Sequence, residues 1–169
     1  MTSAQPSPQP SQPPATGLAA LSEAAKDAST AAALQDVLAA EHAAVWSYSL
    51  IVAFLPAELD KPATDGAEAH RTRRTDIEAL LTAAGVRPVP AEPAYRTPQP
   101  VTDRASALEL AVVAESDTAA AWHSVLERSS DTALRKAAVV ALTDDTVRLA
   151  RWRQLAGKTP VVPPFPGQP

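Results

Sequence analysis

Proline places the strongest limit on how this sequence can fold, because it is gathered into three stretches. Of the 17 prolines, all but Pro56 and Pro62 lie within residues 1–14, 88–100 and 160–169. Proline removes a hydrogen bond from a helix interior and clashes with the preceding turn, so helices belong between these stretches. Alanine is abundant there, and alanine favours helices. The sequence therefore predicts an all-α fold.

The proline stretches also divide the chain into a central domain and two tails. We expect residues 1–28 to form a disordered Pro/Ala-rich N-terminal tail, although 17–28 also fit a short helix. Residues 29–157 form the helical domain, and residues 158–169 form a Pro-rich C-terminal tail. Apolar residues that recur every three or four positions predict four amphipathic helices, at about residues 30–55, 58–84, 103–128 and 131–157.

The lengths of the connections predict how these helices are arranged. The first two helices, and the last two, are joined by short connections, so each pair forms an antiparallel hairpin. The connection at 86–101 is rich in proline and therefore extended. About 16 extended residues reach roughly 50 Å, whereas a helix of about 25 residues is roughly 37 Å long. We expect a four-helix bundle in which a long Pro-rich crossover joins two antiparallel hairpins.

Ionisable residues interrupt the apolar stripe of every predicted helix at a similar height. Counted from the helix ends, one such residue on each helix falls within about two residues of the same level, or roughly 3 Å of helical rise. Nothing in the choice of stripes imposes this agreement. The sequence therefore predicts a buried layer of ionisable side chains, made of Glu41, His70, Glu115 and Asp145.

This arrangement resembles the ferritin-like di-iron proteins, in which a Glu from each of two helices meets a Glu-x-x-His motif from each of the other two. The resemblance spans about residues 30–157. A narrower similarity rests on the segments LQDVLAAEHAAVWSYSL, AHRTRRTDIEALLTAAG and ALTDDTVRLARWR, and on the closing PPFPG. These are similar to an actinobacterial ferritin-like family of unknown function. The resemblance implies a ferritin-like bundle but no established activity.

The chain departs from the di-iron pattern at two ligand positions. Ala67 stands where the pattern has a glutamate, and Arg148 stands where it has a histidine. Arginine stays protonated and cannot bind a metal, but its charge would neutralise buried carboxylates, with Arg74 as a second candidate for this role. We therefore expect a degenerate di-iron-type site without a cofactor. The protein would be non-catalytic and act through protein contacts, as a homodimer.

The main alternative is a metal-binding or oxidative-stress protein that holds one iron, manganese or zinc ion. Its ligands would be the members of the layer, Glu41, His70, Glu115 and Asp145. Two further interpretations stay open: a displaced metal site that uses Glu68, His42 or Asp144, and a pocket for a small molecule. The direction of Arg148 distinguishes them, because an inward guanidinium favours the metal-free or the ligand-binding interpretation.

Charge and composition exclude several classes of function. The net charge of −4 gives no basic field for nucleic acid or acidic membranes. We expect Arg71, Arg73 and Arg74 to form a solvated helix face, since acidic residues follow at once. The absence of cysteine excludes thiolate chemistry. We see no secretion signal and no run of about 18 apolar residues, which predicts a cytoplasmic protein without nucleic-acid or membrane partners.

Overall fold

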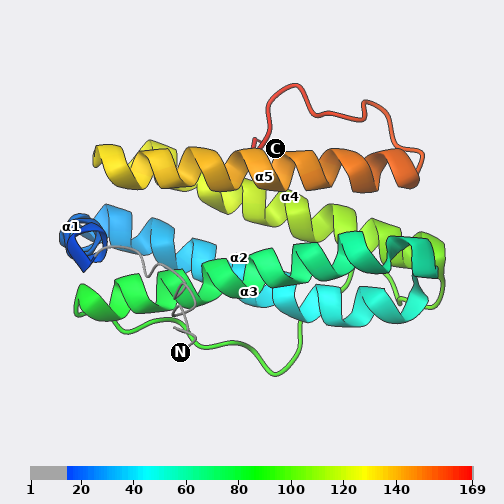
Figure 1. The fold of residues 1–169 in the computed structure, drawn as a ribbon, viewed down its shortest axis with the longest axis horizontal. Helices are drawn as coiled ribbons and strands as arrows, with labels where there is room; N and C mark the ends of the chain where they lie inside the picture. The colour runs from blue at the N-terminus through cyan, green and yellow to red at the C-terminus, as the bar shows by residue number, and fades with distance from the viewer. Residues whose placement is uncertain (1–14, 169) are drawn as a thin grey trace, which may run out of the picture.

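The chain is all-helical in the computed structural model, which describes residues 15–168 (Figure 1). Over that range it has five α-helices and no β-strand, so the predicted all-α class is confirmed. The α-helices are α1 (Ala15–Ala24), α2 (Ala28–Ile51), α3 (Asp60–Ala83), α4 (Arg104–Arg128) and α5 (Thr132–Leu155). Two short 3-10 helices, η1 (Val52–Phe54) and η2 (Ala57–Leu59), connect α2 to α3.

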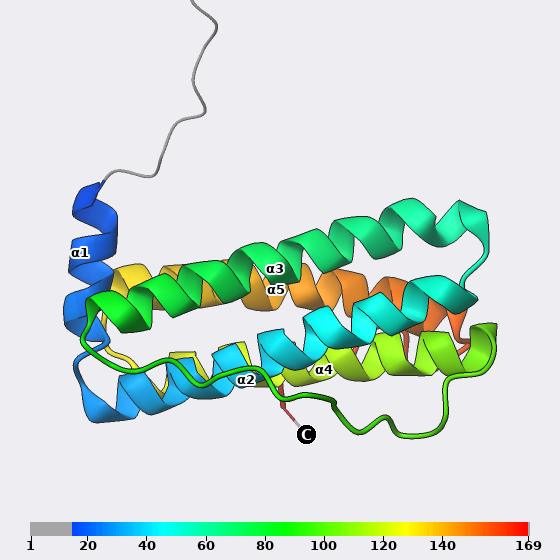
Figure 2. The same ribbon diagram turned by 90° about the horizontal axis from the view of Figure 1, so that it is seen from below.

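The four long helices run alongside one another, and α1 lies across one of their ends (Figures 1 and 2). The helices α3 and α4 run opposite to α2, whereas α5 runs in the same direction as α2. The helix α2 packs against α3 and α4, and α4 packs against α5. The extended segment between α3 and α4 travels along the length of α2 (Figure 2), which is the predicted crossover.

Side chains of α2 hold this crossover in place. The amide of Gln35 donates to the carbonyl of Arg87 at 2.7 Å and accepts from the backbone N–H of Val89 at 2.8 Å. The Nε2 atom of His42 lies 3.2 Å from the carbonyl of Val89. Farther along, the rings of Trp46 and Tyr95 lie 5.8 Å apart. These contacts let a proline-rich segment follow a helix without a strand partner.

Aspartates fix the starts of three helices. Asp27, Asp103 and Asp131 each accept a hydrogen bond from the backbone N–H three residues later, at 2.8 Å. A side-chain oxygen at this position satisfies one of the unpaired N–H groups of a helix start. At α4 the hydroxyl of Ser106 also accepts from the backbone N–H of Asp103, which completes a capping box. The starts of α4 and α5 therefore lie within one residue of the predicted ones.

The N-terminal part of the chain is more ordered than the sequence predicts. Residues 15–24 form α1 and Ala28 begins α2, so the expectation of a disordered segment over 1–28 is wrong from residue 15 onward. Residues 1–14 lie outside the described residues. Ala25 is fully buried and Leu21 is half-buried against the core. The apolar positions of this segment are few, but they pack against helices that lie far away in sequence.

Two apolar clusters fill the space between the long helices. On α2 the clusters meet between Leu38 and Ala44, and on α5 they meet between Ala141 and Leu149. Glu41 and Asp145 fall inside these intervals, and His70 and Glu115 lie at the corresponding boundaries on α3 and α4. One cluster includes Tyr48, Ile51, Leu108, Leu149 and Trp152, and the other includes Leu34, Leu38, Ile77, Leu81, Trp122 and Leu134.

One helical segment is apolar and long enough to cross a membrane by length and composition, contrary to the sequence-based expectation. It comprises α2 and η1, residues Ala28–Phe54, within which a window of 18 residues has a mean hydropathy of 1.4. Helix α2 lies between α3 and α4 and presents Glu41 to the interior. A core helix meets the same criteria because it is apolar on more than one face.

Candidate functional site

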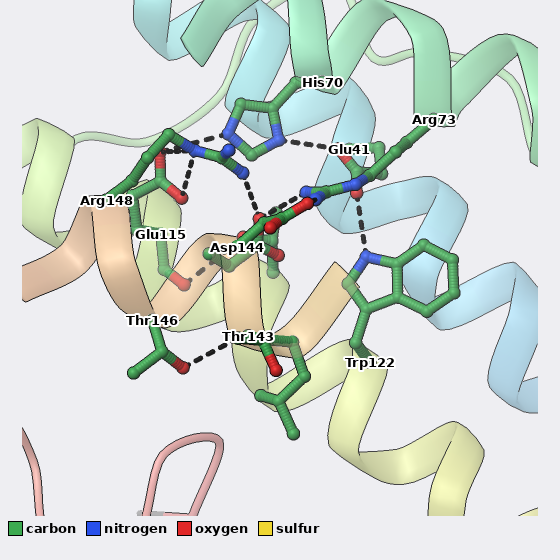
Figure 3. A network of polar contacts seen from close by, with 12 residues as sticks. Glu41, His70, Arg73, Glu115, Trp122, Thr143, Asp144, Thr146 and Arg148 are labelled. Atoms are coloured by element: carbon green, nitrogen blue, oxygen red, sulfur yellow. Dashed lines mark hydrogen bonds and ion pairs between the residues drawn. The ribbon is translucent and has the colours of Figure 1, made fainter. Parts of the chain in front are cut away.

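Each of the four long helices contributes one fully buried ionisable residue to a common centre (Figure 3). These residues lie at the boundary between the two apolar clusters, so each helix brings one polar side chain to the same level. All are 0 % exposed: Glu41 on α2, His70 on α3, Glu115 on α4 and Asp145 on α5. We call them, with Arg73 and Arg148, the polar layer.

His70 bridges two carboxylates. Its Nδ1 atom lies 2.7 Å from Oε2 of Glu41, and its Nε2 atom lies 3.2 Å from Oε1 of Glu115. Burial alone would lower the pKa of His70, but hydrogen bonds and charges of Glu115 and Glu41 outweigh burial and raise it to about 9. The imidazole is therefore protonated at neutral pH and donates to both carboxylates.

Arg148 points into the layer, and its guanidinium spans two acidic residues (Figure 3). Its Nε atom donates to both oxygens of Glu115, at 3.0 and 3.1 Å, and its Nη2 atom donates to Oδ1 of Asp145. Burial alone would raise the pKa of Glu115, but His70 and Arg148 outweigh burial and lower it. The inward guanidinium thus keeps Glu115 ionised in a fully buried position.

Arg73 is the member of the layer that sequence reasoning missed. Its Nη1 atom donates to Oδ1 of Asp145, and its Nη2 atom donates to Oδ2 of Asp144 at 3.1 Å. The expectation that Arg73 lies on a solvated face is wrong, since its side chain is only 14 % exposed. The available signal was its position three residues after His70, which places both on one face of α3.

Charges in the polar layer balance without any further ion. The carboxylates of Glu41, Glu115 and Asp145 face the cations of His70, Arg148 and Arg73. Every carboxylate contacts at least one cation, as buried charges require. Burial nevertheless dominates at Asp145 and, even against Arg73, raises its pKa to about 6. Arg74, the other candidate for this role, leaves its buried Nε atom without a hydrogen-bond partner among the described residues.

Three aromatic side chains add further hydrogen bonds to the layer. The hydroxyl of Tyr48 donates to Glu115, and the indole N–H of Trp152 donates to the Tyr48 oxygen at 2.8 Å. The indole N–H of Trp122 donates to Oε1 of Glu41 at 3.0 Å. Burial, followed by the charge of Glu115, raises the pKa of Tyr48 well above its ordinary value, so its proton stays available for donation.

Gly66 on α3 makes room for Tyr48. A Cβ atom at position 66 would lie 2.8 Å from atoms of the Tyr48 ring, closer than carbon atoms approach. The ring therefore rests directly on the backbone of α3, which directs the hydroxyl of Tyr48 toward Glu115. In the sequence Gly66 is only an isolated glycine near the start of a helix, so its role is visible only in the folded chain.

The donor set suits at most one metal ion. Ligand atoms of His70, Glu115 and Asp145 lie within 4.8 Å of one another, and Oδ2 of Asp145 is buried without a hydrogen-bond partner among the described residues. However, Arg148 binds the Glu115 and Asp145 oxygens that an ion would need. Ala67 offers no second carboxylate, so the residues present do not fit a dinuclear centre.

The residues of the predicted displaced site do not gather in the layer. Glu68 is exposed and its carboxylate lies 3.5 Å from Arg71. His42 faces the crossover segment through its Nε2 atom. Asp144 is exposed and reaches the layer only through Arg73. These positions therefore provide no second group of converging ligands.

Comparison with known proteins identifies relatives whose own function is not described. No curated protein matches this chain. Among solved structures, the chain is similar to a conserved hypothetical protein, Rv2844, from Mycobacterium tuberculosis, with a TM-score of 0.74 and 36 % sequence identity. The match covers 76 % of this chain and 98 % of that one. Residues 33–169 match the family described as Domain of unknown function (DUF4439), and the chain belongs to that family.

Proposed function

We propose that this protein is a ferritin-like four-helix bundle that works without a metal and acts through protein contacts, as a homodimer. Two antiparallel helix pairs support the ferritin-like topology: α2 with α3, and α4 with α5 (Figures 1 and 2). One long crossover joins the two pairs, as in ferritin-like folds. The family match and the similar mycobacterial protein are consistent with it but name no activity.

The observation that carries this proposal is the position of the Arg148 guanidinium. It binds both oxygens of Glu115 and one oxygen of Asp145, where an ion shared by these residues would sit. A permanent cation in this place satisfies the buried carboxylates and opposes entry of a second cation. The polar layer then serves as an internal ion network that aligns the helices, and the surface carries the function.

Metal content tests the proposal directly. We expect protein purified without chelators to contain no stoichiometric iron, manganese or zinc when its metal content is measured by inductively coupled plasma mass spectrometry. We expect the double variant Ala67→Glu, Arg148→His to gain metal, because it restores a carboxylate and an imidazole at the two altered positions. Glu68→Gln, at an exposed carboxylate on the same helix, is the matched control. Stoichiometric metal in the unaltered protein, lost in Glu115→Gln, would overturn the metal-free proposal.

Oligomeric state tests the second half of the proposal. Sedimentation velocity should show a dimer that persists at micromolar concentration. A monomer at all concentrations would remove the homodimer while leaving the metal-free layer unaffected, because the layer lies within one chain. Contacts with other proteins would then have to account for the function.

A second candidate is a site for one metal ion, and a specific observation favours it. Oδ2 of Asp145 is buried and unpartnered among the described residues, and it belongs to the group of His70, Glu115 and Asp145 that could surround an ion. Glu41, which contacts Nδ1 of His70, would then orient the ring so that Nε2 faces the ion. Calorimetric titration with Mn²⁺ and Zn²⁺ decides between the candidates. One equivalent bound by the unaltered protein, and none by Asp145→Asn, would favour the metal site.

A further inference from the structure

A groove separates α3 from α5 near the end of the molecule where α1 crosses. Its volume is about 650 Å³, within the range of about 300–1,000 Å³ that is usual for small-molecule pockets. Most of its lining is apolar. We call it the α1–α3–α5 groove, and its apolar lining includes Leu18, Leu21, Ile77, Leu80, Leu134 and Val140.

The groove has a buried floor and an exposed rim. Leu80, Trp122 and Leu134 form part of the floor and are 4 %, 4 % and 1 % exposed. On the rim, Leu18 is 44 % exposed and Val140 is 55 % exposed. Trp122 is held by its hydrogen bond to Glu41, so the floor is anchored to the polar layer. Large apolar side chains on a concave surface are typical of a ligand site.

Charged groups beside the groove leave no excess of either sign. Arg73 and Asp144 line it and pair with each other at 3.1 Å. Asp76 and Lys136, the other ionisable groups of the lining, have opposite charges. Asp76 and Lys136 are both exposed, whereas the floor of Leu80, Trp122 and Leu134 is buried and apolar. An ionic group placed against that floor would lose its hydration on a surface without charge. The electrostatics therefore favour an uncharged occupant.

We propose that the α1–α3–α5 groove binds an uncharged, apolar small molecule, such as a medium-chain alcohol. The groove is concave, so a second copy that presented the same groove would leave the cavity unfilled. A small apolar molecule would instead cover Leu80, Trp122 and Leu134 between α3 and α5. This inference does not depend on whether the polar layer holds a metal.

A pair of neighbouring residues on α5 provides a matched test. Val140 lines the groove, whereas Val139 is similarly exposed, at 50 %, and does not line it. We expect Nile red, an uncharged apolar fluorophore, to bind the full-length protein saturably and to shift its emission to the blue. Val140→Trp should weaken binding about tenfold or more by filling the groove, while Val139→Trp should leave it unchanged.

Fold and specificity controls keep this test decisive. Circular dichroism should match for both variants, and Ala137→Trp, another exposed position in the lining, replaces Val140→Trp if that variant unfolds. Decanol should displace Nile red, while decanoate and decylamine should compete about tenfold less well because they carry charge. Equal competition by the charged compounds would overturn the uncharged class.

Two outcomes overturn the binding site itself. The first is the absence of saturable Nile red binding, or equal loss of binding in Val139→Trp and Val140→Trp. The second is self-association in sedimentation velocity that Val140→Trp abolishes, without saturable binding of Nile red. That result would assign the groove to a second copy of the chain.

Discussion

The four long helices differ in how deeply they lie. Eleven residues of α2 and twelve of α4 are buried, against seven of α3 and six of α5. The buried pair, α2 and α4, pack directly on each other. Between the more exposed pair, α3 and α5, Arg73 reaches across to Asp144 and Asp145.

The contacts between α2 and α4 therefore rest on apolar packing, whereas those between α3 and α5 rest on charged bridges. Two hollows lie along the side between α3 and α5: the α1–α3–α5 groove and a smaller hollow of about 360 Å³ beside Trp152 and Arg148. Ion pairs span a gap that shorter apolar side chains would leave open. The same side therefore contains both the charge compensation of the polar layer and the candidate ligand site.

The largest effect on stability is expected when a buried carboxylate is removed from α4, one of the two more deeply buried helices. Glu115→Ala would leave His70, Arg148 and Tyr48 without their shared acceptor. Loss of one partner from a buried ion pair costs about 3–5 kcal/mol, which urea unfolding would measure. Glu109→Ala, on the same helix but in a surface pair with Lys158, should cost about 1 kcal/mol or less. Equal losses would show that the layer is not an energetic centre.

The pH dependence of stability sharpens the role of His70. Its folded pKa of about 9 lies above the ordinary value of 6.5, so its stabilising contribution is complete below pH 6.5 and is lost as pH rises through 9. The loss amounts to roughly 3 kcal/mol, since each pKa unit corresponds to about 1.4 kcal/mol. The pKa of Asp145 is raised to about 6, so the titration of Asp145 affects stability mainly at lower pH than the titration of His70. Unfolding free energies measured from pH 6.5 to 10 should decline for the unaltered protein and stay flatter for His70→Gln.

The contact between α2 and α3 offers a test of close packing. Gly66→Ala should destabilise the fold by about 1–3 kcal/mol, because the added Cβ would meet the Tyr48 ring. Gly17→Ala places a Cβ in open space on α1, where it should stabilise by about 0.5–1 kcal/mol. Thermal unfolding of the two variants compares them. A neutral Gly66→Ala would indicate that the tyrosine is free to move aside.

The smallest expected effect concerns the bridge between α3 and α5. Arg73→Met removes a part-buried donor from Asp144 and Asp145 but leaves Asp145 its contact with Arg148. We expect a loss of about 1–2 kcal/mol. Arg71→Met, two residues away in a surface pair with Glu68, should change stability by about 0.5 kcal/mol or less. If both variants behave alike in urea unfolding, Arg73 contributes no more than a surface residue.

Much of the fold follows from patterns that repeat along the chain. The ends of α4 and α5 could be predicted because proline, glycine and aspartate mark helix boundaries locally. The level of Glu41, His70, Glu115 and Asp145 could be predicted because helical rise is uniform. The inward direction of Arg148 was one of two stated possibilities. A guanidinium on a long stem can also reach outward to water, and only packing decides between the two.

Other features depend on contacts between distant residues. Arg73 was assigned to solvent because it lies among several charged neighbours, yet the nearness of α5 determines its partner. The indoles of Trp122 and Trp152 gave no sign that they would donate to Glu41 and Tyr48, since any buried indole needs a partner. A short helix before residue 28 was one of two open alternatives, because its few apolar residues stabilise a helix only when α3 and α5 lie beneath it.

The location of Arg148 on the last helix affects how the chain matures during synthesis. Glu41, His70 and Glu115 all precede α5, which begins only at Thr132. A ribosome-bound chain that ends before α5 would hold Glu115 beside His70 and Tyr48 but without its guanidinium. In such a chain Glu115 would keep its contact with His70 but would lack the two hydrogen bonds from Arg148. Completion of the polar layer therefore waits for the final helix, although domains usually form from their N-terminal end first.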